Sequence, residues 1–268
     1  MSGAPILDDS PAWFQAEPFG LNGERGPLRA ASAITLAPFG WLEGEGDAFL
    51  HPSEAVMLTD RMHPRRRHSL LAGRHAAKGA LAALVPGLAP RAVAIRPGVL
   101  EQPVVAGPGT ANLQVSLSHA GPVALAVAFP EACPMGVDVE LIAPDRLAAM
   151  ESQTTPSERS MATAAAASAE EGLTRLWCLK EALSKVLRCG LTVPFELLEV
   201  SRLTLDGPVY RADFTNFGQY LGISRVCGRL AVALVLPHNV QPVGTPPWMG
   251  AWGGWLSRAA AALEGWSE

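Results

Sequence analysis

Residues 75–85 read His-Ala-Ala-Lys-Gly-Ala-Leu-Ala-Ala-Leu-Val, and residues 177–187 read Trp-Cys-Leu-Lys-Glu-Ala-Leu-Ser-Lys-Val-Leu. The two stretches align with Lys78 over Lys180 and Leu81 over Leu183. A second pair follows at a similar offset, Gly-Pro-Val-Ala-Leu-Ala-Val from Gly121 and Gly-Arg-Leu-Ala-Val-Ala-Leu from Gly228. Either match alone is weak, but their shared offset indicates a duplicated unit of roughly a hundred residues.

Each copy is predicted to contain one helix and several antiparallel strands. The first helix spans residues 68–85, ahead of Pro86 and Gly87, and the second begins at a capping box formed by Ser168 and Glu171 and ends at Gly190. Alternating apolar residues predict strands at 113–118, 123–129, 135–140, 197–205, 209–214 and 230–236. We therefore expect an α+β fold, a pseudo-twofold pair of similar subdomains that each pack a helix on a small antiparallel sheet. The cleft between two such halves is a common place for a ligand or active site.

Four regions follow from this organisation. Residues 1–30 are rich in Pro, Gly and Asp and predict a loose N-terminal arm. The first half is predicted over residues 31–143 and the second half over residues 144–238. Residues 239–268 form a tryptophan-rich tail. In the tail, Trp and Ala recur at spacings of three and four, which predicts an amphipathic helix over 251–266. We expect this helix to dock on its own protein, the alternative being a partner or a membrane surface.

The composition excludes several classes of protein. The 268 residues are 49% hydrophobic with a net charge of −4, too apolar for a disordered chain and too acidic to favour nucleic acid as a partner. No apolar run has the length of a membrane span, and the N-terminus lacks the basic start of a signal peptide. The four cysteines show no Cys-x-x-Cys spacing, so neither a zinc site nor a disulfide framework is predicted. We expect a reduced, cytoplasmic setting.

Positive charge is concentrated in one stretch, residues 61–78, which contains no acid. Its basic residues are Arg61, Arg65, Arg66, Arg67, Arg74 and Lys78. Such a stretch suits a compact anion, and the alternative is a solvated helix face.

The residues Gly-Val-Asp-Val-Glu at 136–140 carry the strongest local signal. On a strand, Asp138 and Glu140 project from one face while Val137 and Val139 face the core. Two neighbouring carboxylates repel each other unless a hard cation such as Mg²⁺ lies between them. The alternative is an edge strand with two solvated acids.

Two further groups add polar chemistry. On the second predicted helix, Trp177, Glu181 and Lys185 share one stripe, although Glu181 and Lys185 could equally form a surface ion pair. Ser118 and His119 end a predicted strand, where His119 suits anion binding or a structural role in the turn.

Together these motifs resemble the phosphopantetheinyl transferase family, specifically the large monomeric branch that serves peptide synthetases, polyketide synthases and siderophore pathways. The family markers are G-[IV]-D-x-E and [FW]-x-x-K-E-[AS]-x-x-K, preceded by a Ser-His pair and a basic G-R-x-x-[AS]-[RK] helix. This chain has all four in the family order, at 136–140, 177–185, 118–119 and 73–78. The resemblance also implies two similar α+β halves with the active site between them.

The resemblance implies a role for each motif. Asp138, Glu140 and Glu181 would hold Mg²⁺, with Mn²⁺ as an alternative ion, and Glu181 and Lys185 would be catalytic. Coenzyme A, the co-substrate, would be bound by Arg67, Arg74, Lys78, Ser118, His119 and Lys185. Which of Arg65, Arg66 and Arg67 contacts the 3'-phosphate stays open. The partners implied are apo acyl or peptidyl carrier proteins and the carrier domains of polyketide, nonribosomal peptide and fatty acid synthases. We expect a monomer with neither a nucleic-acid partner nor a membrane span.

The chain departs from the family pattern at two places. Ala120 replaces the hydroxyl residue that follows the Ser-His pair, and the basic residue before a proline corresponds either to Arg96 and Pro97 or to Gln102 and Pro103. Two rival functions are a magnesium-dependent hydrolase of nucleotides or phosphodiesters and a module that binds carrier proteins without chemistry.

Overall fold

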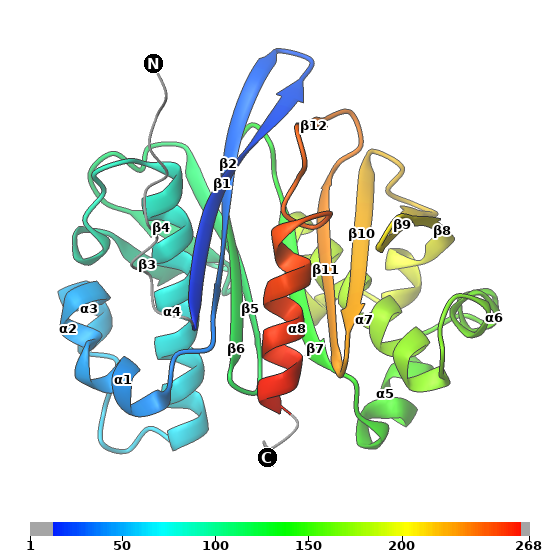
Figure 1. The fold of residues 1–268 in the computed structure, drawn as a ribbon, viewed down its shortest axis with the longest axis horizontal. Helices are drawn as coiled ribbons and strands as arrows, with labels where there is room; N and C mark the ends of the chain where they lie inside the picture. The colour runs from blue at the N-terminus through cyan, green and yellow to red at the C-terminus, as the bar shows by residue number, and fades with distance from the viewer. Residues whose placement is uncertain (1–12, 264–268) are drawn as a thin grey trace.

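Two five-stranded antiparallel sheets form the frame of the protein, whose structure is a computed structural model that describes residues 13–263 (Figure 1). The first sheet has the order β12-β1-β2-β6-β5, with β1 at Phe14–Gly23, β2 at Gly26–Thr35, β5 at Leu113–Ala120, β6 at Val123–Pro130 and β12 at Gln241–Val243. The second has the order β7-β11-β10-β9-β8, with β7 at Gly136–Leu141, β8 at Val200–Asp206, β9 at Val209–Phe214, β10 at Tyr220–Cys227 and β11 at Leu230–Pro237.

One long helix covers each sheet. The helix α4, Pro64–Leu84, packs across β6, β2 and β5, and the helix α7, Ala169–Leu187, packs across β7, β11 and β10. Shorter elements complete the halves: α1 at Phe39–Gly44, α2 at Gly46–Phe49, α3 at Pro52–Ala55, a two-stranded sheet of β3 at Ala94–Pro97 and β4 at Pro103–Ala106, α5 at Leu147–Ser152 and α6 at Pro156–Ala164. The predicted α+β fold of two similar halves is confirmed.

The central strands β6 and β11 show why the two halves fold alike. Both are apolar on both faces, as strands buried between two layers are. Leu125 and Val127 of β6 and Val232 and Leu234 of β11 belong to one hydrophobic core shared by the two sheets. The alternate residues are mostly alanines, which pack in a separate core with α4 in the first half and with α7 in the second. Because alanine is small, each long helix lies close to its sheet.

The hairpins that contain these strands have the same turn. Ala120 pairs with Val123 across Gly121 and Pro122, and Cys227 pairs with Leu230 across Gly228 and Arg229. Gly121 and Gly228 both have φ of 54°, a conformation that a two-residue hairpin loop requires and that glycine adopts without strain.

A buried ion pair is also repeated. The Nζ of Lys78 lies 2.5 Å from Glu54 Oε2, and the Nζ of Lys180 lies 2.7 Å from Glu158 Oε2. All four side chains are at most 1% exposed. Each glutamate also accepts the backbone N–H of a buried residue at or beside a strand, Ile95 for Glu54 and Val200 for Glu158. Lys78 and Lys180 therefore have the same structural role in the two halves, since each neutralises a buried glutamate.

The structure corrects several predicted boundaries. Residues 14–30, predicted as a loose arm, instead form β1 and half of β2, and residues 1–12 lie outside the described residues. β7, which the sequence assigns to the first half, pairs with β11 and so belongs to the second sheet. The helix α4 begins at Pro64 rather than residue 68, because proline suits the first helical position and the His63 side chain accepts the N–H of Arg65. The second helix ends at Leu187 rather than Gly190, with Arg188 in the left-handed conformation.

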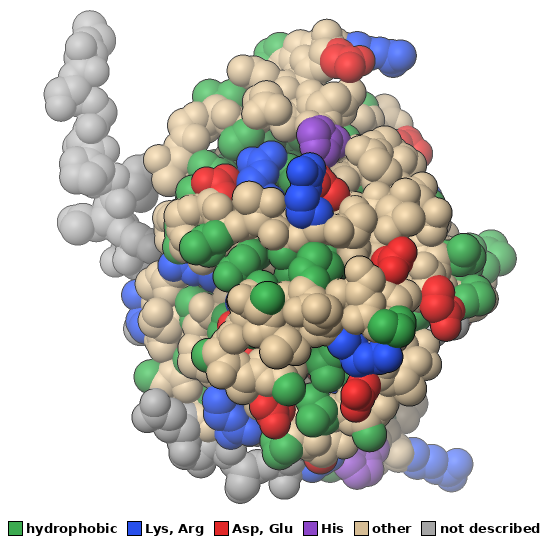
Figure 2. All heavy atoms as spheres, turned by 90° about the vertical axis from the view of Figure 1, so that its right-hand side faces the viewer, with side chains coloured by type: hydrophobic (Ala, Val, Ile, Leu, Met, Phe, Trp, Pro, Cys, Tyr) green, Lys and Arg blue, Asp and Glu red, His purple; other side chains and the backbone are tan. Residues whose placement is uncertain are grey.

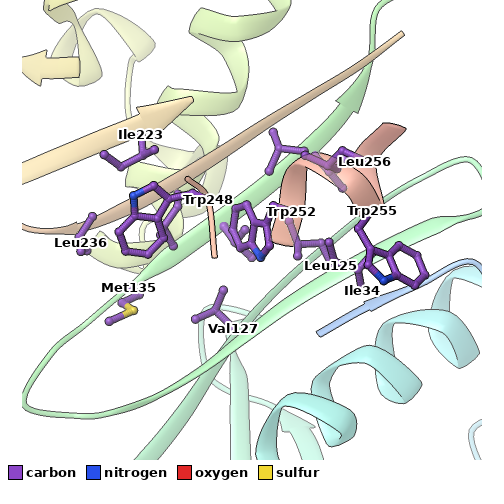
Figure 3. Close-up of a cluster of buried hydrophobic side chains, with 14 of the residues drawn as sticks. Ile34, Leu125, Val127, Met135, Ile223, Leu236, Trp248, Trp252, Trp255 and Leu256 are labelled. Carbon is purple, nitrogen blue, oxygen red and sulfur yellow. The ribbon is translucent and has the colours of Figure 1, made fainter. Parts of the chain in front are cut away.

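The C-terminal helix α8, Ala251–Leu263, lies between the two halves, across both sheets (Figures 1 and 3). Trp248, Trp252 and Trp255 are at most 4% exposed and pack in the shared core. The Trp252 indole N–H donates to Ser32 Oγ at 3.1 Å, and Arg225 donates to the carbonyl of Trp248 at 2.9 Å. The tail therefore docks on its own protein as predicted, while residues 264–266 of the predicted helix fall outside the described residues.

None of the helices that the structure describes combines the length and the hydropathy needed to cross a bilayer. Figure 2 views the molecule from the side of α6, where positive and negative side chains are interspersed over the surface rather than gathered by sign. Positive charge is concentrated instead in a cavity between the two halves, described next.

Candidate active site

The two sheets meet edge to edge at β5 and β7, and this seam carries the predicted site. On β7, Val137 and Val139 face the shared core, so Asp138 and Glu140 project together toward α7, as the alternation predicts. Ser118 and His119 lie at the end of β5. The seam therefore brings Ser118 and His119 of β5 close to the carboxylates of β7, which face the helix α7 of the second half.

Gly136 allows α7 to approach β7 closely. A Cβ atom at this position would overlap the carbonyl oxygen of Ala182 and lie 2.9 Å from Val186 Cγ2. The absence of a side chain there lets the helix pack directly on the strand. Glu181 and Lys185, one turn apart on α7, are thereby brought to the face of β7 that carries Asp138.

Asp138 is the most connected residue of the site. Its side chain is 5% exposed, and its Oδ1 accepts hydrogen bonds from Ser118 Oγ at 2.7 Å and from Lys185 Nζ at 2.7 Å. Its second oxygen, Oδ2, is buried without a hydrogen-bond partner among the residues that the structure describes. A buried carboxylate oxygen without a partner is costly, so this atom favours a cationic ligand.

The carboxylates of Glu140 and Glu181 both have raised pKa values. Burial, then the charge of Asp138, raises the pKa of Glu140 to about 7, against the opposing effect of Arg146, whose Nη1 lies 2.5 Å from Glu140 Oε2. Burial and the charge of Asp138 also raise the pKa of Glu181. The mutual repulsion shows that the three predicted metal ligands lie in one electrostatic neighbourhood.

The carboxylates do not converge as an assembled metal site. Within residues 13–263, no three His, Cys, Asp or Glu side chains are arranged to hold a metal ion. Asp138 and Glu140 are instead paired with Lys185 and Arg146. The donor set nevertheless suits a hard cation, because all three groups are carboxylates and Asp138 Oδ2 lacks a partner.

A cavity of about 430 Å³ lies beside these residues and is lined by both halves. The second half contributes Glu181, Lys185 and Arg188, all from α7 or its C-terminal cap. The first half contributes Arg66 and Arg74 from α4, Arg96 from β3 and His119 from β5. Burial of its imidazole, followed by the charge of Lys185, lowers the pKa of His119. Five cationic side chains thus face a space bordered by two acids, Glu101 and Glu181, which suits a polyanionic ligand.

The basic residues predicted from the sequence separate into two groups. Arg74 lines the cavity while its Nε lies 3.0 Å from Glu54 Oε1. Lys78 does not line the cavity, since its ammonium is buried against Glu54 and the carbonyls of Phe49 and Val93. Arg67 points instead to Glu43, with 2.6 Å between Nε and Oε1. The structure therefore does not bring Lys78 or Arg67 to the site, because one neutralises a buried acid and the other a surface acid.

Four cavity residues were missed or left open by the sequence, namely Arg66, Arg96, Gln102 and Arg188. Arg66 was one of three adjacent arginines, and the structure selects it as the one at the cavity. Both alternatives for the basic residue before a proline, Arg96 with Pro97 and Gln102 with Pro103, line the cavity. The sequence does not indicate a role for Arg188, because the direction of its side chain depends on the left-handed backbone conformation at the C-terminus of α7.

Comparison with known protein families finds a match over part of the chain. Residues 134–234 match the family model of the 4'-phosphopantetheinyl transferase superfamily, which covers β7, α7 and the strands of the second sheet as far as β11. No curated protein is similar enough to the chain to count as a match. The matched range includes Asp138, Glu140, Glu181 and Lys185, whose geometry is described above. Over residues 134–234, this chain is therefore similar to the 4'-phosphopantetheinyl transferase superfamily.

Proposed function

We propose that this protein moves the 4'-phosphopantetheine arm of coenzyme A to a serine of an apo acyl or peptidyl carrier protein and releases adenosine 3',5'-bisphosphate. The observation that carries the proposal is the placement of Asp138, Glu181 and Lys185 beside an arginine-lined cavity, within the range that matches the superfamily. A cavity with this charge fits the phosphates of coenzyme A. Because both halves of the site lie in one chain, we also propose the large monomeric type.

Asp138, Glu140 and Glu181 would hold one Mg²⁺, or Mn²⁺ as an alternative. The unpartnered Asp138 Oδ2 and the raised pKa values of Glu140 and Glu181 support this assignment. When bound, the ion would supply charge neutralisation at the pyrophosphate of coenzyme A. Its binding would also relieve the repulsion among the three carboxylates.

The protein's own residues would bind the anion and move one proton. Arg66, Arg74 and Arg96 would hold the phosphates of coenzyme A, with His119 at the end of β5. Ser118, which was also predicted to bind coenzyme A, instead donates to Asp138 Oδ1 and is not part of the cavity lining. Arg66 and Arg96 replace Arg67 and Lys78 of the sequence prediction for the geometric reasons given above. Oriented cations of this kind stabilise the charge that develops during phosphoryl transfer.

Transfer forms a bond between the carrier's serine oxygen and the β-phosphorus and breaks the bond from that phosphorus to the adenosine bisphosphate oxygen. Glu181, or a water that it orients, would accept the serine proton, because its carboxylate lines the cavity. Lys185 would neutralise the leaving phosphate. Its ammonium is already held at the site by Asp138 and by the carbonyl of Val137.

The direct test incubates the purified protein with coenzyme A, Mg²⁺ and a panel of apo acyl, aryl and peptidyl carrier domains, and weighs each carrier by mass spectrometry. The proposal expects at least one carrier to gain the phosphopantetheine mass. If coenzyme A is consumed while every carrier keeps its mass, the protein is a hydrolase. If neither the amount of coenzyme A nor the mass of any carrier changes, the result favours a protein that binds carrier proteins without catalysing a reaction.

Two matched variants test the site. Asp138→Asn and Glu181→Gln keep the size of each side chain and remove its charge, so we expect transfer to fall by about 100-fold or more. The fold should survive, as circular dichroism would show, and activity should depend on Mg²⁺ and be lost in EDTA. Arg67→Ala serves as the control because Arg67 lies outside the cavity lining, and it should transfer at the wild-type rate. Near-normal transfer by both charge-removing variants would contradict the metal assignment.

A further inference from the structure

The seam between β5 and β7 is held differently from the rest of the two sheets. Among the described strands, β5 pairs by backbone hydrogen bonds with β6, and β7 pairs with β11, while no backbone ladder joins β5 to β7. Strands in contact without a ladder have no backbone register of their own. The ladder with β11 fixes which face of β7 carries Asp138, so contacts across the seam set only how β7 lies against β5.

Serine hydroxyls take the place of the ladder. Leu117 of β5 packs in the core on the α4 side, so Ser116 and Ser118 project from the opposite face of the strand. The buried Oγ of Ser116, a residue 4% exposed, accepts the backbone N–H of Val137 at 3.0 Å. Two residues along, Ser118 Oγ donates to Asp138 Oδ1 at 2.7 Å.

The peptide groups on both sides of Val137 are therefore fixed by side chains. Ser116 of the first half holds the N–H of Val137, and Lys185 of α7 holds its carbonyl at 3.0 Å. Asp138 follows directly in the chain, so its backbone is anchored by these contacts. A buried N–H that loses its partner is costly, and β7 would shift to recover one.

We infer that Ser116 is a positioning residue: by holding the N–H of Val137, it sets the register of β7 against β5 and so places Asp138 opposite Ser118 and Lys185. The inference rests on the proposed function, because Asp138 is taken as a metal ligand. Ser116 also borders the cavity, so direct contact with coenzyme A is the competing explanation. The two explanations differ in the step that a substitution would affect.

The test compares Ser116→Val with Ser116→Thr. Both side chains are β-branched and of nearly equal size, and the threonine keeps the hydroxyl. We expect Ser116→Val to lower kcat about tenfold with little change in KM for coenzyme A, and Ser116→Thr to retain most of the wild-type kcat. A second readout needs no activity: electron paramagnetic resonance of Mn²⁺ added to the protein alone should show binding weakened about tenfold in Ser116→Val and largely restored in Ser116→Thr.

Ser32→Ala is the matched control for the loss of a buried serine hydroxyl. Ser32 is 2% exposed and accepts the Trp252 indole N–H, away from the seam, so this variant should lose stability but keep kcat and Mn²⁺ binding. Equal kcat and Mn²⁺ affinity in the valine and threonine variants would overturn the inference. A raised KM for coenzyme A with unchanged Mn²⁺ binding would overturn it in favour of direct contact. A wild-type protein that transfers nothing contradicts the proposed function, while the Mn²⁺ comparison still decides the role of Ser116.

Discussion

The two aligned lysines show how a single residue's environment decides its role. Lys78 and Lys180 occupy equivalent positions on α4 and α7, and each neutralises a glutamate buried in its own half. The two glutamates, in turn, belong to capping boxes at the starts of α3 and α6. The Lys78 ammonium is enclosed by Glu54 and the carbonyls of Phe49 and Val93, so it does not reach the cavity.

We predict that Lys78→Met and Lys180→Met both destabilise the protein, because each leaves a buried carboxylate without its partner. Such a loss costs about 3–5 kcal/mol in general. Lys78→Met should cost less than Lys180→Met, since Arg74 remains 3.0 Å from Glu54. Urea unfolding gives both values. If Lys78→Met instead raises KM for coenzyme A and leaves stability unchanged, Lys78 belongs to the phosphate site after all.

His75 should make the protein sensitive to acid. Its ring is surrounded by the rings of Trp13, Phe14, Trp41 and Phe49, and burial lowers its pKa from 6.5 to about 4. Between these values the unfolded chain binds a proton that the folded chain does not, so the free energy of unfolding falls as the pH falls. The loss amounts to at most about 3 kcal/mol at pH 4.

The measurement is the free energy of unfolding in urea at several pH values between 7 and 4. We expect His75→Gln to lose stability less steeply than the wild type over this window, whatever its stability at neutral pH. Equal slopes for the two proteins would show that His75 is not the group that titrates.

Among the elements, the contact of α7 with β7 matters most to the site, because it joins Glu181 and Lys185 to Asp138. That contact depends on Gly136, whose missing side chain leaves room for the Ala182 carbonyl. In the Gly-Val-Asp-Val-Glu motif, this glycine therefore has a packing role beside Asp138 and Glu140, the two proposed metal ligands.

We predict that Gly136→Ala destabilises the protein by about 1–3 kcal/mol, because the added methyl group forces α7 away from β7. Thermal and urea unfolding measure this loss. Gly254→Ala on α8 is the matched control: nothing lies within 4 Å of its Cβ position, and alanine favours a helix by up to about 1 kcal/mol over glycine. The control should therefore unfold at a higher temperature than the wild type. A neutral Gly136→Ala would mean that α7 and β7 do not pack as closely as described.

The elements also show what the sequence could predict. The apolar runs of β6 and β11 and the alternation at Asp138 and Glu140 are local patterns, and the structure confirms the elements that they predict. The strand β1 was not predictable, because Pro18, Gly20 and Gly23 indicate a loop and its ten-residue pairing with β2 is a tertiary effect. The burial of Lys78 was also hidden, since its partner Glu54 lies 24 residues away and the surrounding charges suggested an exposed face.

On the scale of the whole molecule, one core joins the two halves. It includes side chains of β6 and β7, of β10 and β11, and of α8, so neither sheet buries its inner face alone. Folding of the two halves is therefore expected to be cooperative even though each half has a second core of its own.

We predict that Trp252→Ala lowers stability by about 3–5 kcal/mol, since the residue is 3% exposed and also loses its hydrogen bond to Ser32. Because the core is shared, far-ultraviolet circular dichroism and tryptophan fluorescence should report one coincident transition, in the wild type and in the variant. Two separated transitions in the wild type would show that the halves unfold independently.

The positions of β12 and α8 in the chain also affect how the protein folds during its synthesis. β12 pairs with β1, near the other end of the sequence, and α8 follows β12. While the ribosome is still making the second half, the first sheet lacks this edge strand and the inner faces of both sheets lack their covering helix. A nascent chain in that state exposes apolar surface and unpaired strand edges, the features that chaperones recognise and that lead to aggregation. The core shared by the two halves is therefore completed only after α8, which follows the strands of both sheets in the chain, has left the ribosome.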